Sequence, residues 1–294
     1  MKKSKHIKDF KVKKIYKYKS GYCECGKKTT KKIDGKYICN SCFKMKSLDS
    51  KLEERNLVIG DIHIPYQDDK AIKCVLDYSR KYKPDRIIIN GDLIDFYTLS
   101  VFDKCPERKD SLQDEIDKTK VFLNKLRRGY KGEIVYLQGN HENRLQRFLW
   151  NNPVLVSVNA LSTENLFELK KNNIKEVKVN GDYWSAESGE YQIGDLTIQH
   201  GDGRLNGAKY SQNPGYAAFN TLKMKGGNNV VMGHTHRLAM LYNRVGDKSI
   251  VGVEGGCLCQ TTRGNWQQGF VTFKSKGKLT YDYEIHRIVN GNLS

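Results

Sequence analysis

The chain has 294 residues, a formal net charge of +18 and 38% hydrophobic residues. This length suffices for one large α/β domain with a small appendage, and no apolar run approaches the ~20 residues that a membrane-spanning helix needs. The lysine-rich N-terminus is followed by no apolar segment, which excludes a secretory signal. Of the eight cysteines, four cluster near the N-terminus and four are scattered along the chain. This distribution favours a reducing cytosol rather than a disulfide framework.

The positive charge is concentrated near the N-terminus. Residues 1–56 contain 18 Lys and Arg against 6 Asp and Glu, a balance of +12, whereas the rest of the chain has a balance of +6. Residues 1–20, the basic arm, alternate lysine with apolar and aromatic side chains, so that Tyr16 or Tyr18 is suited to stacking on bases. Such an arm is typical of a segment that binds a polyanion, most often nucleic acid. A solubilising tail is the alternative interpretation.

Two pairs of cysteines lie in residues 21–46, on either side of a predicted hairpin whose turn is Asp34-Gly35. Four thiolates in this layout are typical of a zinc ribbon with one structural Zn. A disulfide pair or reduced thiols is the competing interpretation, but with so few apolar residues metal is the stronger source of folding energy. Cys257 and Cys259, with no partner pair nearby, are predicted to be buried thiols beside a turn. The ribbon cysteines are Cys23, Cys25, Cys39 and Cys42.

Residues 47–56 are polar and predict a linker or short helix, after which a domain of residues 57–294 begins. Within that domain, Ser111 and Asp114 form a variant of the capping box and Gly129 marks a helix end. Alternating strands and helices predict right-handed crossovers into a parallel sheet, followed after residue 185 by short strands and turns. Helices are predicted over residues 69–81, 111–129, 163–171 and about 214–225.

Five apolar runs of the domain each end in Asp, Asn or His. Apolar runs bounded by glycine are typical of strands buried on both faces, and ligand groups gather outside the carboxyl ends of such strands. Carboxylates and neutral imidazoles together can hold two divalent cations, with one group bridging; a satisfied polar group at each strand end is the alternative. The runs are residues 58–60, 86–90, 133–138, 196–199 and 229–232, and the converging residues are Asp61, His63, Asp92, Asn140, His200, His234 and His236.

The order of these motifs resembles that of the calcineurin-like metallophosphoesterases: D-x-H, G-D, G-N-H-E/D, H and G-H-x-H. The resemblance covers about residue 57 to the end. Asp61-Ile-His-Ile-Pro65 and Gly91-Asp-Leu-Ile-Asp-Phe96 also look like the phage and bacterial phosphohydrolase branch. The resemblance implies an α/β fold, a sandwich of two sheets flanked by helices (α/β/β/α), and a cytoplasmic protein, in the host cell if a phage encodes it.

The resemblance also implies a role for each residue. His141 is similar to the general acid of the family and Asp95 to the carboxylate that orients it; capping a loop is the alternative for Asp95. Arg144 and Arg204 are candidates for substrate binding, with a surface arginine as the alternative for each. Mixed Asp, His and Asn ligation suits Mn, Fe, Zn or Ni, with Mn favoured. One ion would be held by Asp61, His63 and His236 and the other by Asn140, His200 and His234, with Asp92 bridging.

The expected function is that of a two-metal-ion phosphodiesterase, which hydrolyses esters of nucleic acid or nucleotides through a metal-bridging hydroxide. Phe96-Tyr97 stands where the protein serine/threonine phosphatases of this superfamily carry Arg-Gly, which disfavours a protein phosphatase. A phosphomonoesterase acting on small phosphates or phosphoproteins, with the ribbon as a docking module, is the second interpretation. A non-enzymatic scaffold is the third, although no ligand position is degraded.

Overall fold

The computed structural model divides the chain into two compact units, Met1–Leu52 and Glu53–Ser294. Of the predicted basic arm only Ser20 is among the described residues, and Arg204 lies outside them. Among the described ranges, no helix combines the length and the apolar composition needed to cross a bilayer. The structure describes residues 20–33, 35–42, 53–178, 189–201, 213–224, 227–261, 264–276 and 279–294.

The N-terminal unit contains two small antiparallel ribbons. Strand β1 (Gly21–Tyr22) pairs with β2 (Lys28–Thr29), and β3 (Lys32–Ile33) pairs with β4 (Lys36–Tyr37). Gly35 has a φ of 81°, the left-handed conformation that a tight hairpin turn requires. The predicted hairpin between the two cysteine pairs is therefore confirmed.

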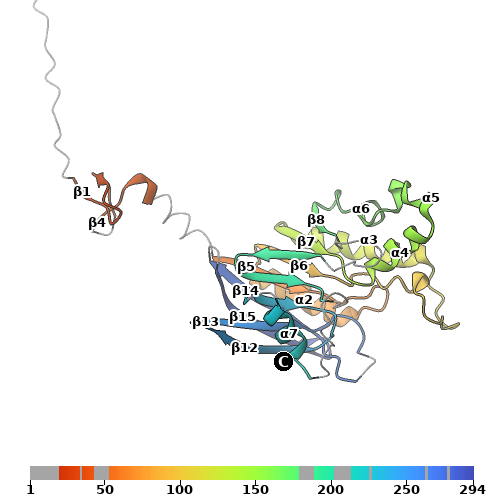
Figure 1. The fold of residues 1–294 in the computed structure, drawn as a ribbon. Coiled ribbons are helices and arrows are strands. Elements are labelled where there is room, and N and C mark those ends of the chain that lie inside the picture. The colour runs from red at the N-terminus through yellow and green to blue at the C-terminus, as the bar shows by residue number, and fades with distance from the viewer. Residues whose placement is uncertain are drawn as a thin grey trace, which may run out of the picture. The chain divides into compact units, whose positions relative to one another are not determined.

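The larger unit is built on a seven-stranded sheet in the order β16-β15-β14-β5-β6-β7-β8 (Figure 1). The strands from β5 to β8 run parallel, and β14, β15 and β16 extend the sheet in antiparallel pairs. The strands are β5 Glu53–Ile59, β6 Arg86–Asn90, β7 Glu133–Leu137, β8 Ile174–Val177, β14 Gly269–Lys276, β15 Leu279–Val289 and β16 Asn292–Leu293.

A second sheet of five strands has the order β12-β13-β11-β10-β9. Its central strands β10, β11 and β13 are parallel, and hairpins join β9 to β10 and β12 to β13. Gly194 and Gly246 lie in the turns of these hairpins with φ values of 57° and 60°. The strands are β9 Glu190–Ile193, β10 Leu196–Gln199, β11 Asn229–Met232, β12 Leu238–Val245 and β13 Lys248–Gly255.

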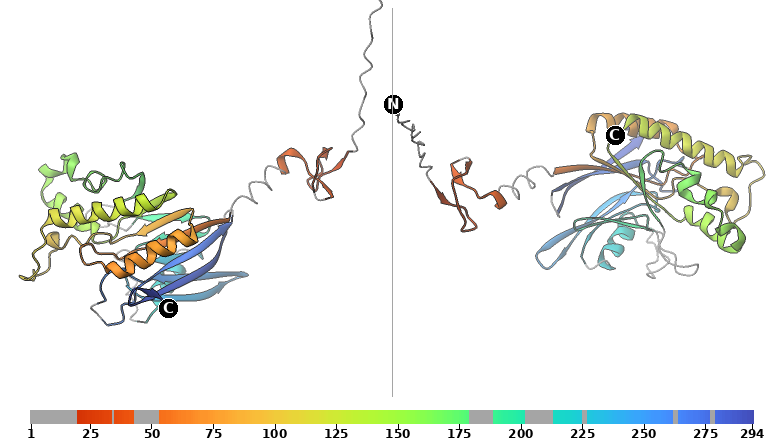
Figure 2. Two further views of the ribbon diagram at one scale, coloured as in Figure 1. Left: turned by 180° about the vertical axis from the view of Figure 1, so that it is seen from behind. Right: turned by 90° about the horizontal axis from the view of Figure 1, so that it is seen from above.

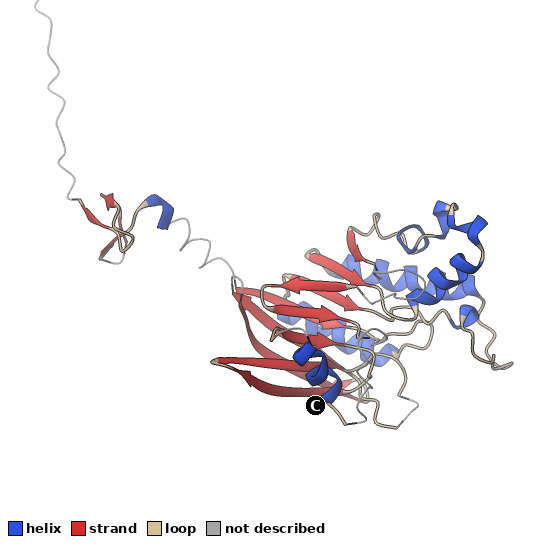
Figure 3. Cartoon of the chain, viewed as in Figure 1, coloured by secondary structure: helices blue, strands red, loops and turns tan. Residues whose placement is uncertain are grey.

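The two sheets pack face to face, with helices on both outer faces (Figures 2 and 3). Valine, leucine and isoleucine side chains fill the space between them, among them Val58 and Val135 from the first sheet and Ile198 from the second. Helices α2 (Asp69–Tyr82) and α3 (Leu112–Gly129) cover the first sheet, and α7 (Tyr216–Met224) covers the second. The predicted α/β/β/α sandwich is confirmed.

The helix starts follow the sequence signals. The side chain of Ser111 accepts a hydrogen bond from Asp114 N at 3.1 Å, and the Asp114 carboxylate accepts one from Ser111 N at 2.8 Å. This reciprocal pair completes the predicted capping box of α3. The side chain of Asp68 caps α2 by accepting from Lys70 N and Ala71 N.

The predicted linker of residues 47–56 is wrong at its C-terminal end, because strand β5 already begins at Glu53. The polar residues of this part of β5 pair with β14, and their side chains form hydrogen bonds with neighbouring strands. Asn56 is fully buried, donates to Ser275 Oγ at 3.3 Å and accepts from Arg86 Nη1 at 3.0 Å. Polar composition alone therefore did not indicate a strand.

The predicted helix of residues 163–171 begins at the expected residue but is too long. Helix α6 covers only Thr163–Leu166, because Glu168 has a φ of 53° and turns follow it. Phe167 and Leu169, which follow this short helix, are buried in the core. The other elements of this region are α4 Glu142–Asn151, α5 Pro153–Val156 and the 3-10 turn η2 Asn159–Leu161.

Candidate metal centre

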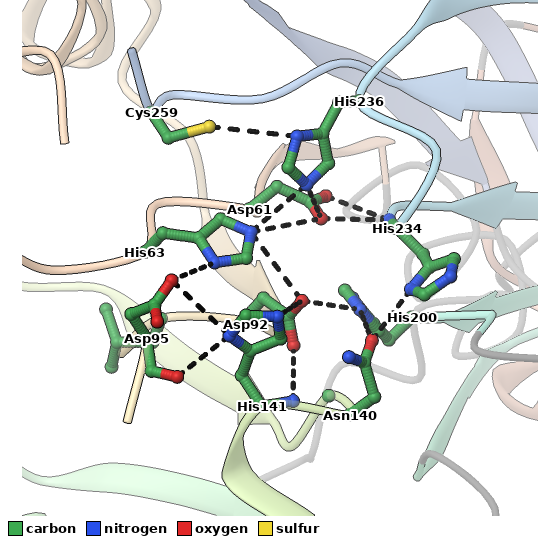
Figure 4. A network of polar contacts seen from close by, with 12 residues as sticks. Asp61, His63, Asp92, Asp95, Asn140, His141, His200, His234, His236 and Cys259 are labelled. Atoms are coloured by element: carbon green, nitrogen blue, oxygen red, sulfur yellow. Dashed lines mark hydrogen bonds and ion pairs between the residues drawn. The ribbon is translucent and has the colours of Figure 1, made fainter. Parts of the chain in front are cut away.

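The seven predicted ligand side chains meet at one edge of the sandwich (Figure 4). Each lies in the segment that follows a strand, and these strands belong to both sheets. The carboxyl ends of β5, β6 and β7 meet those of β10 and β11 at this edge, which brings residues up to 175 positions apart in sequence into one cluster. Residues of the cluster fall into two groups, separated by the carboxylate of Asp92.

The first group contains Asp61, His63 and His236. His236 Nε2 lies 3.1 Å from Asp61 Oδ1 and 3.1 Å from His63 Nε2. All three side chains are buried. Their polar atoms therefore point at one another with little exposure to water.

The second group contains Asn140, His200 and His234 around Asp92. His200 Nε2 lies 3.0 Å from Asn140 Oδ1 and 3.2 Å from Asp92 Oδ2. His234 Nδ1 lies 2.7 Å from the same Asn140 oxygen. Asp92 Oδ2 also lies 3.6 Å from His63 Nε2, so this oxygen faces both groups.

The hydrogen bonding of His200 shows that the second group fits a cation. Its Nδ1 lies 2.9 Å from the carbonyl oxygen of Asn90, and because a carbonyl only accepts, Nδ1 carries the proton. The Nε2 of the neutral ring then directs a lone pair at two oxygens, one from Asn140 and one from Asp92. Acceptors that face one another in a buried site are stabilised by a cation between them.

The charges at this edge are strongly coupled. Burial raises the pKa of Asp92, but attraction to His141 and His200 outweighs burial and holds the pKa well below its usual value. Burial opposes protonation of His236, yet Asp61 attracts the charged ring strongly enough to raise its pKa to about 10. His236 thus favours its protonated form beside Asp61, and a divalent cation held by these residues would displace that proton.

The backbone is strained at five of the predicted ligand residues. Asp61, His63 and Asp92 have φ values of 49°, 50° and 46°, and His234 and His236 have values of 65° and 57°. Each non-glycine residue in this left-handed region costs roughly 1 kcal/mol. Five such residues in one cluster indicate that the fold holds these side chains in place at the expense of local stability.

Two glycines of the motifs allow the strand ends to approach closely. A Cβ atom on Gly139 would lie 2.4 Å from Asp92 Oδ1, and one on Gly233 would lie 2.6 Å from Asp61 Oδ2. Any larger residue would displace a carboxylate of the cluster. The glycine of each motif is therefore required by packing against a neighbouring loop.

Asp95, His141 and Arg144 form a connected group beside the cluster. His141 Nδ1 lies 2.8 Å from the carbonyl oxygen of Asp95 and 3.5 Å from its carboxylate, so Nδ1–H donates its hydrogen bond to the main-chain oxygen. Arg144 donates to the same carbonyl at 2.8 Å and to His141 Nε2 at 3.0 Å. The carboxylate of Asp95 lies closer to His63 Nδ1, at 3.3 Å. Arg144 is thus held in the site and is not a free surface arginine.

Glu142 is the last residue of the G-N-H-E/D motif, and the structure gives it a supporting role that the motif did not indicate. Its buried carboxylate accepts from Asp92 N at 3.0 Å, Leu93 N at 2.8 Å and Gly139 N at 2.7 Å. One side chain thereby fixes the loops that carry Asp92 and Asn140. Its position directly after Asn140-His141 was the signal that could have indicated this role.

Cys259 was interpreted only as a buried thiol. It is buried, but its Sγ also lies 3.7 Å from His236 Nδ1, on the opposite side of that ring from Asp61. Trp266 packs against the same ring, with centroids 4.0 Å apart. These two residues orient His236, a contact that no local sequence pattern indicates.

A buried ion pair supports the loop that carries His234 and His236. Arg237 Nε lies 3.1 Å from Glu254 Oε2, and the same oxygen accepts from Thr235 Oγ1 at 3.0 Å. Glu254 is fully buried. The loop after β11 is therefore tied to β13. Neither Arg237 nor Glu254 belongs to a motif of the sequence.

The four cysteines of the N-terminal unit form a separate cluster. Their sulfur atoms all lie within 4.8 Å of one another, and none is in a disulfide. Cys25 and Cys39 Sγ are 3.5 Å apart, and Cys39 Sγ accepts from Cys42 N at 3.4 Å. Main-chain N–H groups at Cys25 and Cys39 lower the pKa of the Cys23 thiol to about 6. The cluster has the composition of a tetrahedral thiolate site.

The sandwich and its cluster of imidazole and carboxylate groups define a metal-binding α/β protein. The chain belongs to the calcineurin-like phosphoesterase family, whose model matches residues 55–238. It is therefore a metal-dependent phosphoester hydrolase.

Two phage proteins are similar over most of the chain. The Gene 54 protein of Mycobacterium phage L5 is 27% identical over 260 residues, and that of Mycobacterium phage D29 is 28% identical over 268. Each alignment covers 83% of this chain and 97% of the relative. The expected resemblance to phage proteins is confirmed.

The solved structures to which the chain is similar include two Vps29 proteins. Vacuolar Protein Sorting 29 from Cryptosporidium parvum has a TM-score of 0.43 at 15% identity, over 83% of this chain and 95% of that one. Vps29 from Entamoeba histolytica complexed with Zn has a TM-score of 0.39 at 14% identity, over 82% and 96%.

Proposed function

We propose that the chain is a two-metal-ion phosphodiesterase that acts on nucleic acid or nucleotides. One observation carries the two-metal part of the proposal. Asp92 Oδ2 lies 3.2 Å from His200 Nε2 and 3.6 Å from His63 Nε2, so a single carboxylate oxygen faces both ligand groups. A bridging carboxylate between two cation positions has this arrangement.

The donor sets suit borderline divalent ions such as Mn, Fe, Zn or Ni, and we favour Mn. When bound, a pair of such cations activates a water molecule and neutralises the charge that develops on the phosphate. One ion is assigned to Asp61, His63 and His236 and the other to Asn140, His200 and His234, with Asp92 shared by both.

We assign protonation of the leaving oxygen to the residues beside the cluster. Arg144 Nη2 and His141 Nε2 lie 3.0 Å apart and both line the cleft. When Arg144 turns from His141 to a substrate phosphate, Nε2 becomes free to take up a proton from solvent and pass it to the leaving oxygen, while Nδ1 keeps the proton that it donates to Asp95 O. Asp95 positions both side chains through its carbonyl and its carboxylate.

Two features favour a nucleic-acid ester over a phosphoprotein. The +12 balance of residues 1–56 suits a polyanion, and the four clustered cysteines suit a structural Zn that folds the segment next to the basic arm. Phe96, at the position of the clamp arginine of protein phosphatases, is fully buried against Phe167 and is not available to phosphate.

The test compares hydrolysis of bis-p-nitrophenyl phosphate and p-nitrophenyl phosphate in Mn2+, together with labelled single- and double-stranded oligonucleotides. Preference for the diester with oligonucleotide cleavage supports the proposal. Preference for the monoester with intact oligonucleotides contradicts it and favours a phosphomonoesterase. Asp92→Ala and His234→Ala should abolish turnover of the preferred ester while circular dichroism shows an unchanged fold.

A further inference from the structure

A cleft of about 510 Å³ extends from the metal centre along the segment that follows β6. At one end it is bordered by His63, Asp92 and His141. The rest of its lining includes a second set of side chains that neither the ligand motifs nor the proposed catalytic group contains. These are Tyr66, Tyr97, Ser100, Phe102, Asp103 and Arg108.

Arg108 is held between two tyrosine rings in this cleft. The centre of its guanidinium group lies 4.1 Å from the ring of Tyr66 and 4.4 Å from that of Tyr97. Stacking on aromatic faces fixes the plane of the guanidinium without using its N–H groups. Among the described residues no carboxylate forms an ion pair with Arg108. The donors of a positioned arginine therefore remain available to an anion.

The segment that carries Arg108 is fixed in place at several points. Glu115 of α3 is fully buried and accepts from Tyr97 N at 3.2 Å and from Thr98 N at 3.4 Å. Lys104 Nζ donates to Tyr97 O at 2.6 Å, and the Tyr97 hydroxyl accepts from Cys105 N. The 3-10 turn η1 (Tyr97–Leu99) and the residues after it thus present Arg108 in a defined position.

An exposed aromatic side chain lies in the same lining. The side chain of Phe102 is 74% exposed although it borders the cleft, and its neighbour Val101 is 86% exposed. A large apolar ring left in water costs free energy unless a partner covers it. Aromatic rings beside fixed cations are the usual combination for single-stranded nucleic acid, with bases stacked on the rings and phosphates on the cations.

We propose that Phe102 and Arg108, with Arg108 clamped by Tyr66 and Tyr97, form a subsite for the nucleotide next to the scissile phosphate. Phe102 stacks on its base and Arg108 binds its phosphate. This inference rests on the proposed phosphodiesterase function and names the part of the substrate that is recognised. A simple phosphomonoester has neither a second phosphate nor a base, so it gains nothing from this subsite.

The experiment compares the hydrolysis of two diesters by five variants and the wild type. Bis-p-nitrophenyl phosphate offers a scissile diester without a neighbouring nucleotide, and a short single-stranded oligodeoxynucleotide offers both. Arg108→Ala is matched with Lys109→Ala, which removes the same charge one residue away outside the cleft lining, and Phe102→Ala is matched with Val101→Ala. Arg108→Lys keeps the charge but loses the planar stack, and thermal melting confirms that each variant folds.

Arg108→Ala and Phe102→Ala should each lower kcat/KM on the oligonucleotide about tenfold, mainly through KM, as expected for a lost stacking or phosphate contact. The kcat/KM of these two variants on bis-p-nitrophenyl phosphate should stay within about twofold of the wild type. Lys109→Ala and Val101→Ala should stay within the same limit on both substrates. Equal losses on both substrates, or equal effects of Arg108→Ala and Lys109→Ala, overturn the subsite and leave the proposed function standing. A wild-type chain that hydrolyses neither diester removes the proposed function itself.

Discussion

The carboxylate of Asp95 lies 3.3 Å from Nδ1 of His63, a residue that we propose as a metal ligand. A carboxylate in this position accepts a hydrogen bond from Nδ1–H, so Nε2 of His63 is left to bind a cation. Asp95 was expected to orient His141, yet its carboxylate lies closer to His63 and its carbonyl serves His141. Asp95 is therefore a positioning residue for both.

Replacing Asp95 with Asn should weaken metal binding, because an amide is a poorer acceptor for the His63 proton than a carboxylate. Loss of such a supporting partner typically costs about tenfold or more in metal affinity. Isothermal titration of the metal-free chain with Mn2+ measures the change. Asp117→Asn on the exposed face of α3 is the control, and an Asp95→Asn affinity equal to that of the wild type would show that the contact has no role in binding.

Removing the imidazole of His141 should slow the hydrolysis of esters with poor leaving groups more than that of esters with good ones. If His141 supplies a proton to the leaving oxygen, His141→Ala lowers kcat for alkyl or nucleoside esters by ~10²-fold or more, and for p-nitrophenyl esters by far less. A series of diesters with leaving groups of different pKa measures this dependence. His6→Ala, which lies in none of the motifs, is the control; a uniform loss across the series argues against proton donation.

The motif residues could be predicted because each follows an apolar strand, and strands of an α/β sheet end at a common edge. Glu142 and Glu254 could not be assigned, since their partners are main-chain N–H groups or an arginine on other segments. The left-handed φ of Asp61 is likewise imposed by the surrounding loops and not by its residue type. Long-range contacts of this kind leave no periodic pattern in a sequence.

The same reason explains why the role of the Tyr97–Arg108 segment was missed. Arg108 and Tyr66 are far apart in sequence and meet only because the segment after β6 folds back over the cleft. Residues 163–171 show the opposite error. There a helix was predicted to residue 171, but it ends at Leu166, and Phe167 and Leu169 are buried in the turns that follow.

The buried ion pair between Arg237 and Glu254 should contribute strongly to stability. Glu254→Gln leaves a buried guanidinium without its charge partner, and breaking such a pair costs about 3 kcal/mol in the free energy of unfolding. Urea denaturation measures the difference. Asp247→Asn removes the partner of Arg244 in a fully exposed pair and should change stability by less than about 0.5 kcal/mol. Similar effects of the two substitutions would contradict the proposed support of the His234 loop.

Glu115 should make stability depend on pH. Burial raises the pKa of its carboxyl to about 7, so between the ordinary value near 4.5 and pH 7 the folded chain holds a proton that the unfolded chain has lost. The stability of the wild type relative to Glu115→Gln should therefore fall as pH rises through this range, by ~2 kcal/mol after allowance for solvent screening. Urea titrations from pH 4.5 to 8 measure it, and a constant difference would mean that Glu115 ionises normally.

The most direct measurement of the central claim is the number and magnetic coupling of Mn2+ ions bound per chain, by metal analysis and electron paramagnetic resonance. Two ions that share the Asp92 carboxylate are close enough to couple, so the wild type should bind two and give a spin-coupled spectrum, while Asp92→Ala should give uncoupled or lost Mn2+. One Mn2+ per chain, or two that remain magnetically independent in the wild type, would contradict a dinuclear centre bridged by Asp92.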